Sequence, residues 1–464
     1  MTLIERVTVA DGREIPDAAT GEIIGRTARH TVADLERMYQ AARRAQKGWA
    51  ALSQERRDAY LLALADAIDA EAEQLAVLLS REQGKPLEGP NARFEIGACS
   101  AWLRATAATA VPSEVLVDEP GNRSELIYKP VGVVAAIGPW NWPLMIMIWQ
   151  VAPSLKMGNS VVVKPSEYTP LSVQALVAVM NDVLPEDVLH VISGDREVGA
   201  AMASHPGFDK IMFTGSTATG KAIIKSSADN LTRLTLELGG NDAGIVLPGT
   251  DIATHADDLF WGAFLNTGQT CAALKRLYVH ESQYEEVVDE LAKRAAATPM
   301  GVGLDAGNVL GPLQNRRQFD IVKRLVDDAR DRGARIAAGG SPAPELGPTF
   351  FQATIVADIE DGAPLVDEEQ FGPALPVIKY TDVSDAIARA NALDAALGAS
   401  VWGDDPDAAR QVALQLEAGT VWINAHGGIH PMVPFGGIKG SGYGLEFGVE
   451  GLKSVAVPMV ITTA

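Results

Sequence analysis

Short apolar runs that alternate with longer amphipathic stretches are the feature of this sequence that most constrains its fold. Such alternation is typical of parallel sheets, because two parallel strands need a long crossover that is usually a helix. A first series of expected strands lies at 131–137, 161–163, 188–192, 211–213, 234–236 and 245–247. A second series lies at 276–279, 335–338, 354–356, 374–379, 399–401 and 420–423. We therefore expect an α/β protein with two mostly parallel sheets.

Other segments would complete and connect these sheets. Residues 31–81 place leucines at helical spacing among charged side chains, which predicts an outer helical layer. The glycine-dense segment 434–444 is typical of a long loop, and 455–461 of one more strand. A chain of 464 residues is too long for one ordinary domain, so we expect two or three.

The charge balance argues against two classes of partner. The 39 basic and 59 acidic residues give a formal net charge of -20, which opposes binding to nucleic acid and to anionic membranes. Residues 130–155 carry no charge and are long enough to span a bilayer, but Gly138-Pro139, Trp142-Pro143 and Pro153 divide them into a strand, a turn and a short helix at 143–151. The N-terminus lacks a signal-peptide pattern, so we expect a cytoplasmic protein.

The chain has only two cysteines, and their contexts differ. Cys99 lies in a run typical of a helix and is expected in the core. Cys271 lies beside Asn266, Gly268 and Gln269, and a small residue with two amides suits a tight, exposed turn better than an apolar core. A thiolate is a good covalent catalyst for a carbonyl carbon, so Cys271 is the first candidate nucleophile. The alternative is a small buried side chain without reactivity.

Two strand-to-helix turns could hold phosphate or sugar. Gly215-Ser-Thr-Ala-Thr-Gly220 follows an expected strand, so its backbone N–H groups would face an anion, although Thr217 replaces the middle glycine of a dinucleotide fingerprint. By spacing alone, Glu237 could bind the ribose hydroxyls. We prefer Lys164-Pro-Ser-Glu167, directly after the strand 161–163, because its ammonium and carboxylate can both reach those hydroxyls.

Seven motifs occur along the chain. They are Trp140-Asn141-Trp-Pro143, Lys164-Pro-Ser-Glu167, Phe213-Thr-Gly-Ser216, Leu236-Glu-Leu-Gly-Gly240, Gly268-Gln-Thr-Cys271, Glu368-Glu-Gln-Phe-Gly-Pro373 and Pro434-Phe-Gly-Gly437. In their order and spacing the chain resembles the aldehyde dehydrogenase superfamily from end to end. The resemblance implies a Rossmann-like coenzyme-binding domain at 1–108 and 130–238 and an α/β catalytic domain at 239–440. It also implies a small β oligomerisation domain, with a hairpin at 109–129 and a strand within 441–464, and a homodimer or homotetramer.

The resemblance also implies the catalytic roles. It places the nucleophile at Cys271, the general base at Glu237 and the oxyanion donors at the Asn141 side-chain amide and the Cys271 backbone N–H. Attack on an aldehyde builds an alkoxide, which passes hydride to the coenzyme and leaves a thioester for water to hydrolyse. Apolar neighbours would raise the pKa of Glu237 toward the range that a base needs. Glu446 is a further candidate in the proton path, and no metal is expected.

By the same resemblance a nicotinamide coenzyme is held by Trp140, Lys164, Ser166, Glu167, Gly215, Ser216, Leu238, Glu369 and Phe371. Lys164 and Glu167 would bind the adenosine ribose, and Glu369 the nicotinamide ribose. The Glu167 carboxylate would repel a 2′-phosphate, so we expect NAD. Arg196 departs from the family pattern and leaves NADP open, and Leu445 replaces a frequent arginine.

The side chains expected around the aldehyde are Trp142, Met145, Ile146, Trp149, Phe264, Leu265, His426 and His430. Succinic semialdehyde dehydrogenases commonly carry an arginine where Trp149 stands, and an indole cannot hold a carboxylate. An apolar tunnel rewards buried apolar area, so we expect an aromatic or medium-chain aliphatic aldehyde, with a semialdehyde as the alternative. The histidines could contact a polar group on the substrate, and core packing is the other interpretation of the apolar side chains.

Three other functions are alternatives. Coenzyme-A acylation would release the thioester to a thiol, but that branch of the family generally lacks the base at Glu237. A Cys-His hydrolase would need a histidine beside Cys271, and the nearest in sequence, His280, ends an expected strand. A binding protein on an inactive scaffold would not need Cys271, Glu237 and Asn141 together.

Overall fold

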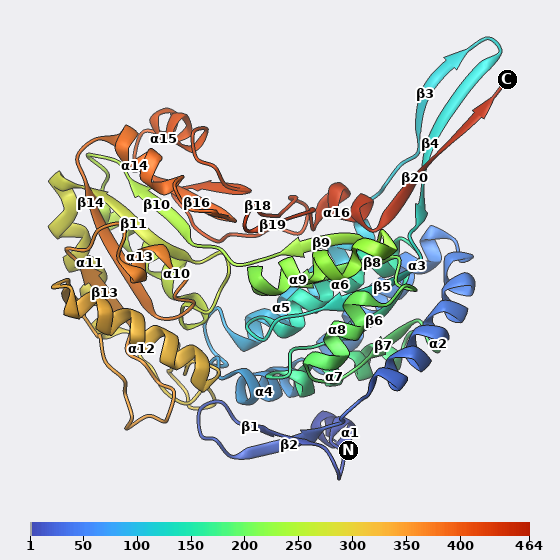
Figure 1. Ribbon diagram of the computed structural model, residues 1–464, viewed down its shortest axis with the longest axis horizontal. Helices are drawn as coiled ribbons and strands as arrows, with labels where there is room; N and C mark the ends of the chain where they lie inside the picture. The colour runs from blue at the N-terminus through green and yellow to red at the C-terminus, as the bar shows by residue number, and fades with distance from the viewer. Residues whose placement is uncertain (1) are drawn as a thin grey trace.

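The computed structural model describes residues 2–464, and two open sheets dominate it (Figure 1). The first sheet has six strands in the order β19-β9-β8-β5-β6-β7. They are β5 (Val133–Ile137), β6 (Ser160–Lys164), β7 (Leu189–Val191), β8 (Lys210–Thr214), β9 (Arg233–Glu237) and β19 (Gly442–Tyr443). All neighbours are parallel except β9 and β19. The strands predicted from 131–137 to 234–236 are therefore confirmed, with small shifts at their ends.

The second sheet has seven strands in the order β12-β13-β14-β11-β10-β16-β17. They are β10 (Asp242–Val246), β11 (Leu274–His280), β12 (Arg335–Ala338), β13 (Thr354–Ala357), β14 (Ala374–Tyr380), β16 (Gly398–Trp402) and β17 (Thr420–Ile423). Only β12 and β13 are antiparallel neighbours. The grouping of 245–247 with the first series was wrong, because β10 pairs with β11 and β16. An apolar run does not specify which sheet it joins.

Helices cover both faces of the six-stranded sheet. They are α2 (Val32–Ala50), α3 (Gln54–Ala70), α4 (Ala72–Gln83), α5 (Ala92–Ala108), α6 (Pro143–Lys156), α7 (Pro170–Asn181), α8 (Arg196–Ser204) and α9 (Thr217–Ser227). Alternate residues of β5 enter different cores: Val134 and Ala136 pack with α3, α5, α6 and α7, whereas Val133 and Ala135 pack with α2, α8 and α9. Because both faces are buried, the strands are continuous apolar runs.

The seven-stranded sheet is covered in the same way. Helices α10 (Ile252–Phe264) and α11 (Tyr284–Ala297) lie on one face. Helices α12 (Arg316–Asp331), α13 (Pro364–Asp367), α14 (Val383–Ala390) and α15 (Pro406–Ala413) lie on the other. The short helices α1 (Leu3–Val7) and α16 (Gly448–Ser454) lie near the ends of the chain. The expected α/β class with two mostly parallel sheets is confirmed.

Helix α6 continues past the proline that was expected to end it. The prediction placed this helix at 143–151, whereas α6 runs from Pro143 to Lys156. Pro153 cannot donate to the Trp149 carbonyl, but the Met157 N–H still donates to the Pro153 carbonyl at 3.0 Å. Every residue of α6 is buried, so packing on all sides offsets the lost hydrogen bond. Within residues 2–464 no helix, α6 included, has both the length and the apolar character that a membrane crossing requires.

A three-stranded antiparallel sheet projects from the body of the molecule (Figure 1). It consists of β3 (Glu114–Glu119), β4 (Asn122–Pro130) and β20 (Ala456–Thr463), with β4 in the centre. The hairpin expected within 109–129 and the strand expected at 455–461 are both present. Large apolar side chains are exposed on this arm: Val115, Leu116, Met459, Val460 and Ile461. Exposed apolar side chains beside open strand edges are typical of an association surface.

The glycine-dense segment 434–444 is more than the loop that was expected. It contains β18 (Ile438–Lys439), which pairs with β15 (Ala395–Ala396), and β19, whose Gly442 pairs with Glu237. The segment therefore fixes the end of β9. The hairpin of β1 (Arg13–Pro16) and β2 (Ile23–Thr27) was not predicted, because its strands are short and mostly solvent-accessible.

Candidate active site

The loop that carries Cys271 has an unusual backbone. It leaves α10 through a short 3-10 turn in which Asn266, Thr267 and Gly268 have φ angles of 51°, 57° and 72°. Left-handed backbone costs a residue with a Cβ roughly 1–2 kcal/mol, and at Gly268 a Cβ would collide with the Gly372 carbonyl. Such strain persists only where neighbouring contacts hold it, and it is concentrated at functional sites.

Side-chain amides supply those contacts. The Asn266 Nδ2 donates to the Asn141 carbonyl at 2.9 Å, which ties the loop to the start of α6. The Gln269 Nε2 donates to the Pro312 carbonyl at 3.2 Å, and its Oε1 accepts from the Gln314 N–H at 2.9 Å. Asn141, Asn266, Gln269 and Gln314, which take part in these hydrogen bonds, are all buried. Hydrogen bonds therefore hold the loop to Asn141 on one side and to residues 312–314 on the other.

Asn141 lies where the predicted oxyanion donor was expected. It is 3% exposed, and its Nδ2 donates to the Gln269 carbonyl at 2.9 Å. An amide nitrogen has two hydrogens, so one remains to bind an oxygen near Cys271. The Asn141 carbonyl accepts from the Asn266 amide and from the Lys85 Nζ at 2.8 Å. Both ends of Asn141 are thus fixed.

The Lys85 ammonium belongs to a buried ion pair that sequence analysis missed. Lys85 Nζ lies 2.6 Å from Glu95 Oε2, and neither side chain is exposed. The other oxygen, Glu95 Oε1, accepts from the N–H groups of Leu144 and Met145 at 2.8 and 3.1 Å, and so satisfies the first turn of α6. Burial lowers the pKa of Lys85 to about 8, and Glu95 opposes this shift. Neither residue has a neighbour in sequence that would have identified the pair.

The surroundings of the Cys271 thiol favour its protonated form. Its residue lies in a turn, as predicted, but it is half-buried rather than exposed. The pKa of the Cys271 thiol is raised to about 12, chiefly by burial; Lys275 opposes the rise, and the carboxylates of Glu237, Asp242 and Glu369 add to it. A proton acceptor is therefore required before the sulfur can attack.

Glu237 has the properties of that acceptor. It ends β9, is 4% exposed, and neither oxygen accepts a hydrogen bond of ordinary geometry from residues 2–464, although the Gly437 N–H approaches it. Burial, and then the charge of Glu446, raise the pKa of Glu237 well above its usual value. Burial also raises the pKa of Glu446 to about 8, which Lys210 opposes. The direction agrees with the prediction, and Glu446 is the second reason for it.

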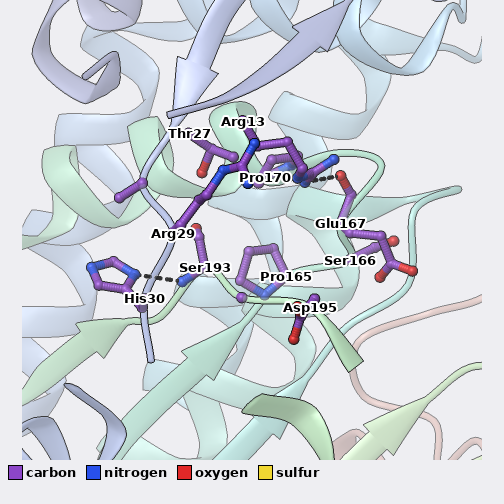
Figure 2. Close-up of a pocket in the computed structure, with 12 residues that line it drawn as sticks. Arg13, Thr27, Arg29, His30, Pro165, Ser166, Glu167, Pro170, Ser193 and Asp195 are labelled. Carbon is purple, nitrogen blue, oxygen red and sulfur yellow. Dashed lines mark hydrogen bonds between the residues drawn. The ribbon is translucent and has the colours of Figure 1, made fainter. Parts of the chain in front are cut away.

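Glu167, one of the two predicted adenosine-ribose residues, lines a pocket of about 100 Å³, whereas Lys164 is not among its lining residues (Figure 2). Ser166 and Glu167 line it, together with Asp195. Two arginines of the N-terminal segment that sequence analysis missed, Arg13 and Arg29, also line it, and Arg13 donates to the Glu167 backbone carbonyl. The pocket residues are Arg13, Thr27, Ala28, Arg29, His30, Pro165, Ser166, Glu167, Pro170, Ser193, Gly194 and Asp195.

Two charges near this pocket differ from expectation. Arg196, the suspected cation for a 2′-phosphate, is exposed at the start of α8 and does not line the pocket, because Asp195 caps the helix by accepting from the Glu197 N–H at 2.9 Å. Lys164 is buried, and burial lowers its pKa, whereas Glu167 and Asp195 oppose the shift. The lysine is therefore held close to the carboxylate with which it was predicted to act.

The other predicted coenzyme residues lie in several places. Gly215 and Ser216 stand between β8 and α9, where the Ser216 Oγ caps the helix by accepting from the Thr219 N–H at 3.3 Å. Trp140 and Phe371 pack edge to face, with ring centroids 5.4 Å apart. Leu238 is buried against Gly220, and Glu369 pairs with Lys275 at 3.0 Å. Lys275 comes about one helical turn after Cys271 in the sequence, but it lies in the strand β11, so helical periodicity did not identify it.

The expected aldehyde-lining residues divide into several environments. Trp142, the N-cap residue of α6, is buried, as are Met145, Ile146 and Trp149 within the helix. The Trp142 Nε1 donates to the Thr270 Oγ1 at 2.9 Å, and Trp149 packs against Phe447 with centroids 4.8 Å apart. Trp142 therefore lies next to the Cys271 loop, while Trp149 lies in an aromatic cluster farther along α6.

The remaining four residues are less uniform. Phe264 is fully buried and stacks on Phe260 in the core of the seven-stranded sheet, which suits core packing better than a tunnel wall. Leu265 is partly buried, and His430 is exposed. The His426 side chain is fully buried, bonds to the Ser400 Oγ at 2.9 Å and packs on Trp422. These contacts leave His426 little freedom to meet a substrate.

Comparison with known proteins agrees with this geometry. A family model described as the aldehyde dehydrogenase family matches residues 9–460. The chain is 38% identical to phenylacetaldehyde dehydrogenase from Pseudomonas fluorescens, over 87% of this chain and 83% of the relative. It is 36% identical to geranial dehydrogenase from Castellaniella defragrans, over 94% of this chain and 92% of the relative. A solved NAD+ complex of an aldehyde dehydrogenase from Bacillus cereus has a TM-score of 0.94 at 34% identity, over 97% of this chain and 92% of that one.

The Lys85–Glu95 pair predicts a large effect on stability. Lys85→Met or Glu95→Gln leaves the other group buried without its partner, so each should lower the free energy of unfolding by about 3–5 kcal/mol. Urea unfolding followed by circular dichroism measures this. Arg93→Ala is the matched control, because Arg93 pairs with Glu73 and Glu88 at the surface and its loss should cost about 0–1 kcal/mol. A Lys85→Met protein as stable as the Arg93→Ala protein would refute the structural role.

Proposed function

The chain belongs to the aldehyde dehydrogenase family, and from that premise we propose that it oxidises an aldehyde to the carboxylic acid through a covalent bond to Cys271. The observation that carries the proposal is the buried Glu237 carboxylate, which has no strong hydrogen-bond partner in residues 2–464 and lies close enough to affect the pKa of Cys271. A buried carboxyl with a raised pKa and without partners is typical of a general base.

The first step needs the sulfur as a thiolate. Glu237 accepts the proton of Cys271, and the sulfur attacks the carbonyl carbon, whose oxygen becomes an alkoxide. The free N–H of Asn141 and the Cys271 backbone N–H would stabilise that oxygen, at about 3 kcal/mol for each donor. When bound, the nicotinamide supplies the acceptor for the hydride that leaves this carbon. A thioester on Cys271 remains.

The second step releases the acid. A water molecule attacks the thioester, Glu237 takes its proton, and the Cys271 sulfur leaves as product forms. Glu446 is buried beside Glu237 and raises its pKa, so the two carboxyls cannot both be charged without cost. We propose that Glu237 passes the proton it took from Cys271 to Glu446, then takes the proton of the attacking water and returns that second proton to the Cys271 sulfur as it leaves.

Two variants test the covalent route. Cys271→Ala should abolish aldehyde oxidation while the coenzyme still binds, because the thiol is separate from the pocket at Glu167. Glu237→Gln should reduce coenzyme once and then accumulate an acyl group of the substrate's mass on the protein, which intact mass spectrometry detects. Because the pKa of Glu237 is raised, wild-type thioester hydrolysis should accelerate as pH rises from neutral and the base ionises. Turnover by Cys271→Ala, or released NADH without trapped acyl group, would contradict the route.

We propose NAD as the coenzyme. The proposal is supported by the residues around the expected ribose site, where Glu167 and Asp195 add negative charge that a 2′-phosphate would meet. Glu369, with 28% of its side chain exposed, is the proposed partner of the nicotinamide ribose. The NAD+ complex of the Bacillus cereus relative agrees with this choice. Arg13 and Arg29, in place of Arg196, are the cations that would favour NADP.

Coenzyme preference follows from these charges. Steady-state kinetics should give a kcat/KM for NAD at least about tenfold above that for NADP, a difference of about 1.4 kcal/mol. Arg29→Ala should lower the efficiency with NADP further and leave that with NAD within about twofold, because the exposed Arg29 lines the pocket as a cation that only the added 2′-phosphate would need. A higher kcat/KM for NADP in the wild type would show that the arginines outweigh the carboxylates.

We propose an apolar substrate, an aromatic or medium-chain aliphatic aldehyde. Trp142 contacts the Cys271 loop through Thr270, Met145 and Ile146 follow it in the first turn of α6, and none of these three buried side chains carries a charge that could hold a distal carboxylate. Burial of apolar area contributes about 25 cal/mol per Å², whereas a carboxylate without a partner costs free energy. The names of the two relatives, phenylacetaldehyde and geranial dehydrogenase, agree with this class.

The substrate proposal is tested by two aldehydes measured side by side. Phenylacetaldehyde should exceed succinic semialdehyde in kcat/KM by at least about tenfold, roughly 1.4 kcal/mol of transition-state binding. The assay follows absorbance of the reduced coenzyme at equal enzyme concentration. Equal or better efficiency with the semialdehyde would refute the apolar site.

We also propose how the three larger sheets divide the function. The six-stranded sheet would bind the coenzyme, the seven-stranded sheet would carry the catalytic domain, and the projecting arm would join copies into a homodimer or homotetramer. The exposed Met459, Val460 and Ile461 support the last point. Sedimentation velocity tests it. A cytoplasmic location fits the scarcity of cysteine.

A further inference from the structure

Lys275 places a buried ammonium group between the nucleophile and the proposed coenzyme site. It lies in β11, and only 2% of its side chain is exposed. Its Nζ donates to the Cys271 carbonyl oxygen and lies 3.0 Å from Glu369 Oε1. A buried charge is stable only with close partners, so these two contacts determine where the ammonium sits.

Glu369 has contacts on two sides. Its Oε1 pairs with Lys275 and accepts from the Gly240 N–H at 3.2 Å, while 28% of its side chain stays exposed. The same carboxylate is the proposed partner of the nicotinamide ribose. Hydroxyl donors that bind the carboxylate stabilise its charge from the other side. The attraction between Glu369 and Lys275 then becomes weaker.

Three of the four charged groups that shift the pKa of the Cys271 thiol are carboxylates. Burial raises the pKa of the Cys271 thiol first, Lys275 lowers it, and Glu237, Asp242 and Glu369 raise it. Asp242 is fully buried in β10, and neither of its oxygens accepts a hydrogen bond from residues 2–464. A thiolate formed here would be surrounded by carboxylates, so the positive charge of Lys275 has a large influence on it.

We propose that Lys275 is the positioning residue that stabilises the Cys271 thiolate, and that the nicotinamide ribose strengthens its effect by engaging Glu369. The proposal rests on the proposed function, in which Cys271 is the nucleophile. Without coenzyme, Glu369 neutralises much of the ammonium charge. With ribose hydroxyls on Glu369, more of that charge acts on the sulfur, and the thiol proton passes to Glu237. The nucleophile is then active only when a hydride acceptor is present.

Alkylation by iodoacetamide measures the thiolate without any turnover. The thiolate attacks the methylene carbon and iodide leaves, so the rate is proportional to the ionised fraction. Cys99 is buried, and a Cys271→Ala protein corrects for any reaction there. The measurement uses the full chain as wild type, Lys275→Met, Glu369→Gln and the double variant, which form a double-mutant cycle.

The cycle separates an effect through Lys275 from a direct effect of Glu369. Lys275→Met should alkylate about tenfold more slowly than wild type at neutral pH, the change that one unit of thiol pKa gives, and Lys275→Arg should restore most of the rate. Glu369→Gln should alkylate several-fold faster than wild type. In the double variant that acceleration should vanish. Equal acceleration with and without the lysine, or a wild-type rate for Lys275→Met, overturns the proposal.

Two ligands test the role of the ribose. ADP-ribose carries the ribose hydroxyls but no nicotinamide, and ADP lacks that second ribose, so ADP is its matched control. At saturation, established by calorimetric titration of each protein, ADP-ribose should accelerate alkylation several-fold in wild type and less than about twofold in Glu369→Gln and Lys275→Met. ADP should have no effect. Acceleration by ADP, or equal acceleration by ADP-ribose in wild type and Glu369→Gln, overturns the control by ribose.

The design stays decisive if Lys275→Met does not fold. Circular dichroism shows whether it does, and the comparison of wild type with Glu369→Gln then decides alone, because that carboxylate is partly exposed and its replacement is mild. Failure of the proposed function has a different signature. Aldehyde oxidation by Cys271→Ala would refute the function, whereas the alkylation cycle reports on Lys275 whether or not any aldehyde is oxidised.

Discussion

The backbone carbonyl of Asn141 is the point on which the arrangement of the site depends. It accepts hydrogen bonds from Lys85, at the end of the outer helical layer, and from Asn266, in the loop before Cys271. The side chain of the same residue donates to the Gln269 carbonyl. Since β5 leads into Asn141 and the Cys271 loop leads into β11, these bonds join the two sheets at one residue. The proposed oxyanion donor and nucleophile are therefore fixed to each other before any ligand arrives, which is the condition for electrostatic stabilisation without reorganisation.

Buried charged side chains fix this connection between the two sheets and also set the reactivity of the site. Lys85 and Glu95 form a fully buried pair, the buried Lys275 pairs with the partly exposed Glu369, and Glu237 with Glu446 is a pair of like charges. Opposite charges removed from water stabilise each other at a cost in desolvation, so such pairs specify geometry more than they add stability. Like charges removed from water raise each other's pKa, which is what a base acting near neutral pH needs. Burial of the same kind thus gives rigidity in one place and reactivity in another.

Contiguous patterns predicted most of the fold, and the family resemblance of short motifs supplied the proposed catalytic residues. The twelve apolar runs became strands, because burial on both faces leaves a clear signal in the sequence, and Cys271, Glu237 and Asn141 lie in short motifs. What failed depended on distant partners. Lys85 acts through Glu95 and Asn141, and Arg13 enters the Glu167 pocket from a hairpin at the other end of the chain. Pro153 did not end α6, because packing around the whole helix outweighs one lost hydrogen bond.

Local sequence patterns were also a poor guide to the residues expected around the aldehyde. Phe264 was expected beside the aldehyde, but it is buried and stacks on Phe260 in the core of the seven-stranded sheet. The most direct measurement of the covalent account is a rapid-quench single turnover of the wild-type enzyme with phenylacetaldehyde that carries deuterium on its carbonyl carbon. Peptide mapping locates the acyl group, and NMR locates the deuterium. We expect the acyl group on the peptide that contains Cys271 and the deuterium on the nicotinamide ring. An acyl group on Cys99 or on no peptide, or deuterium in the solvent, would contradict it.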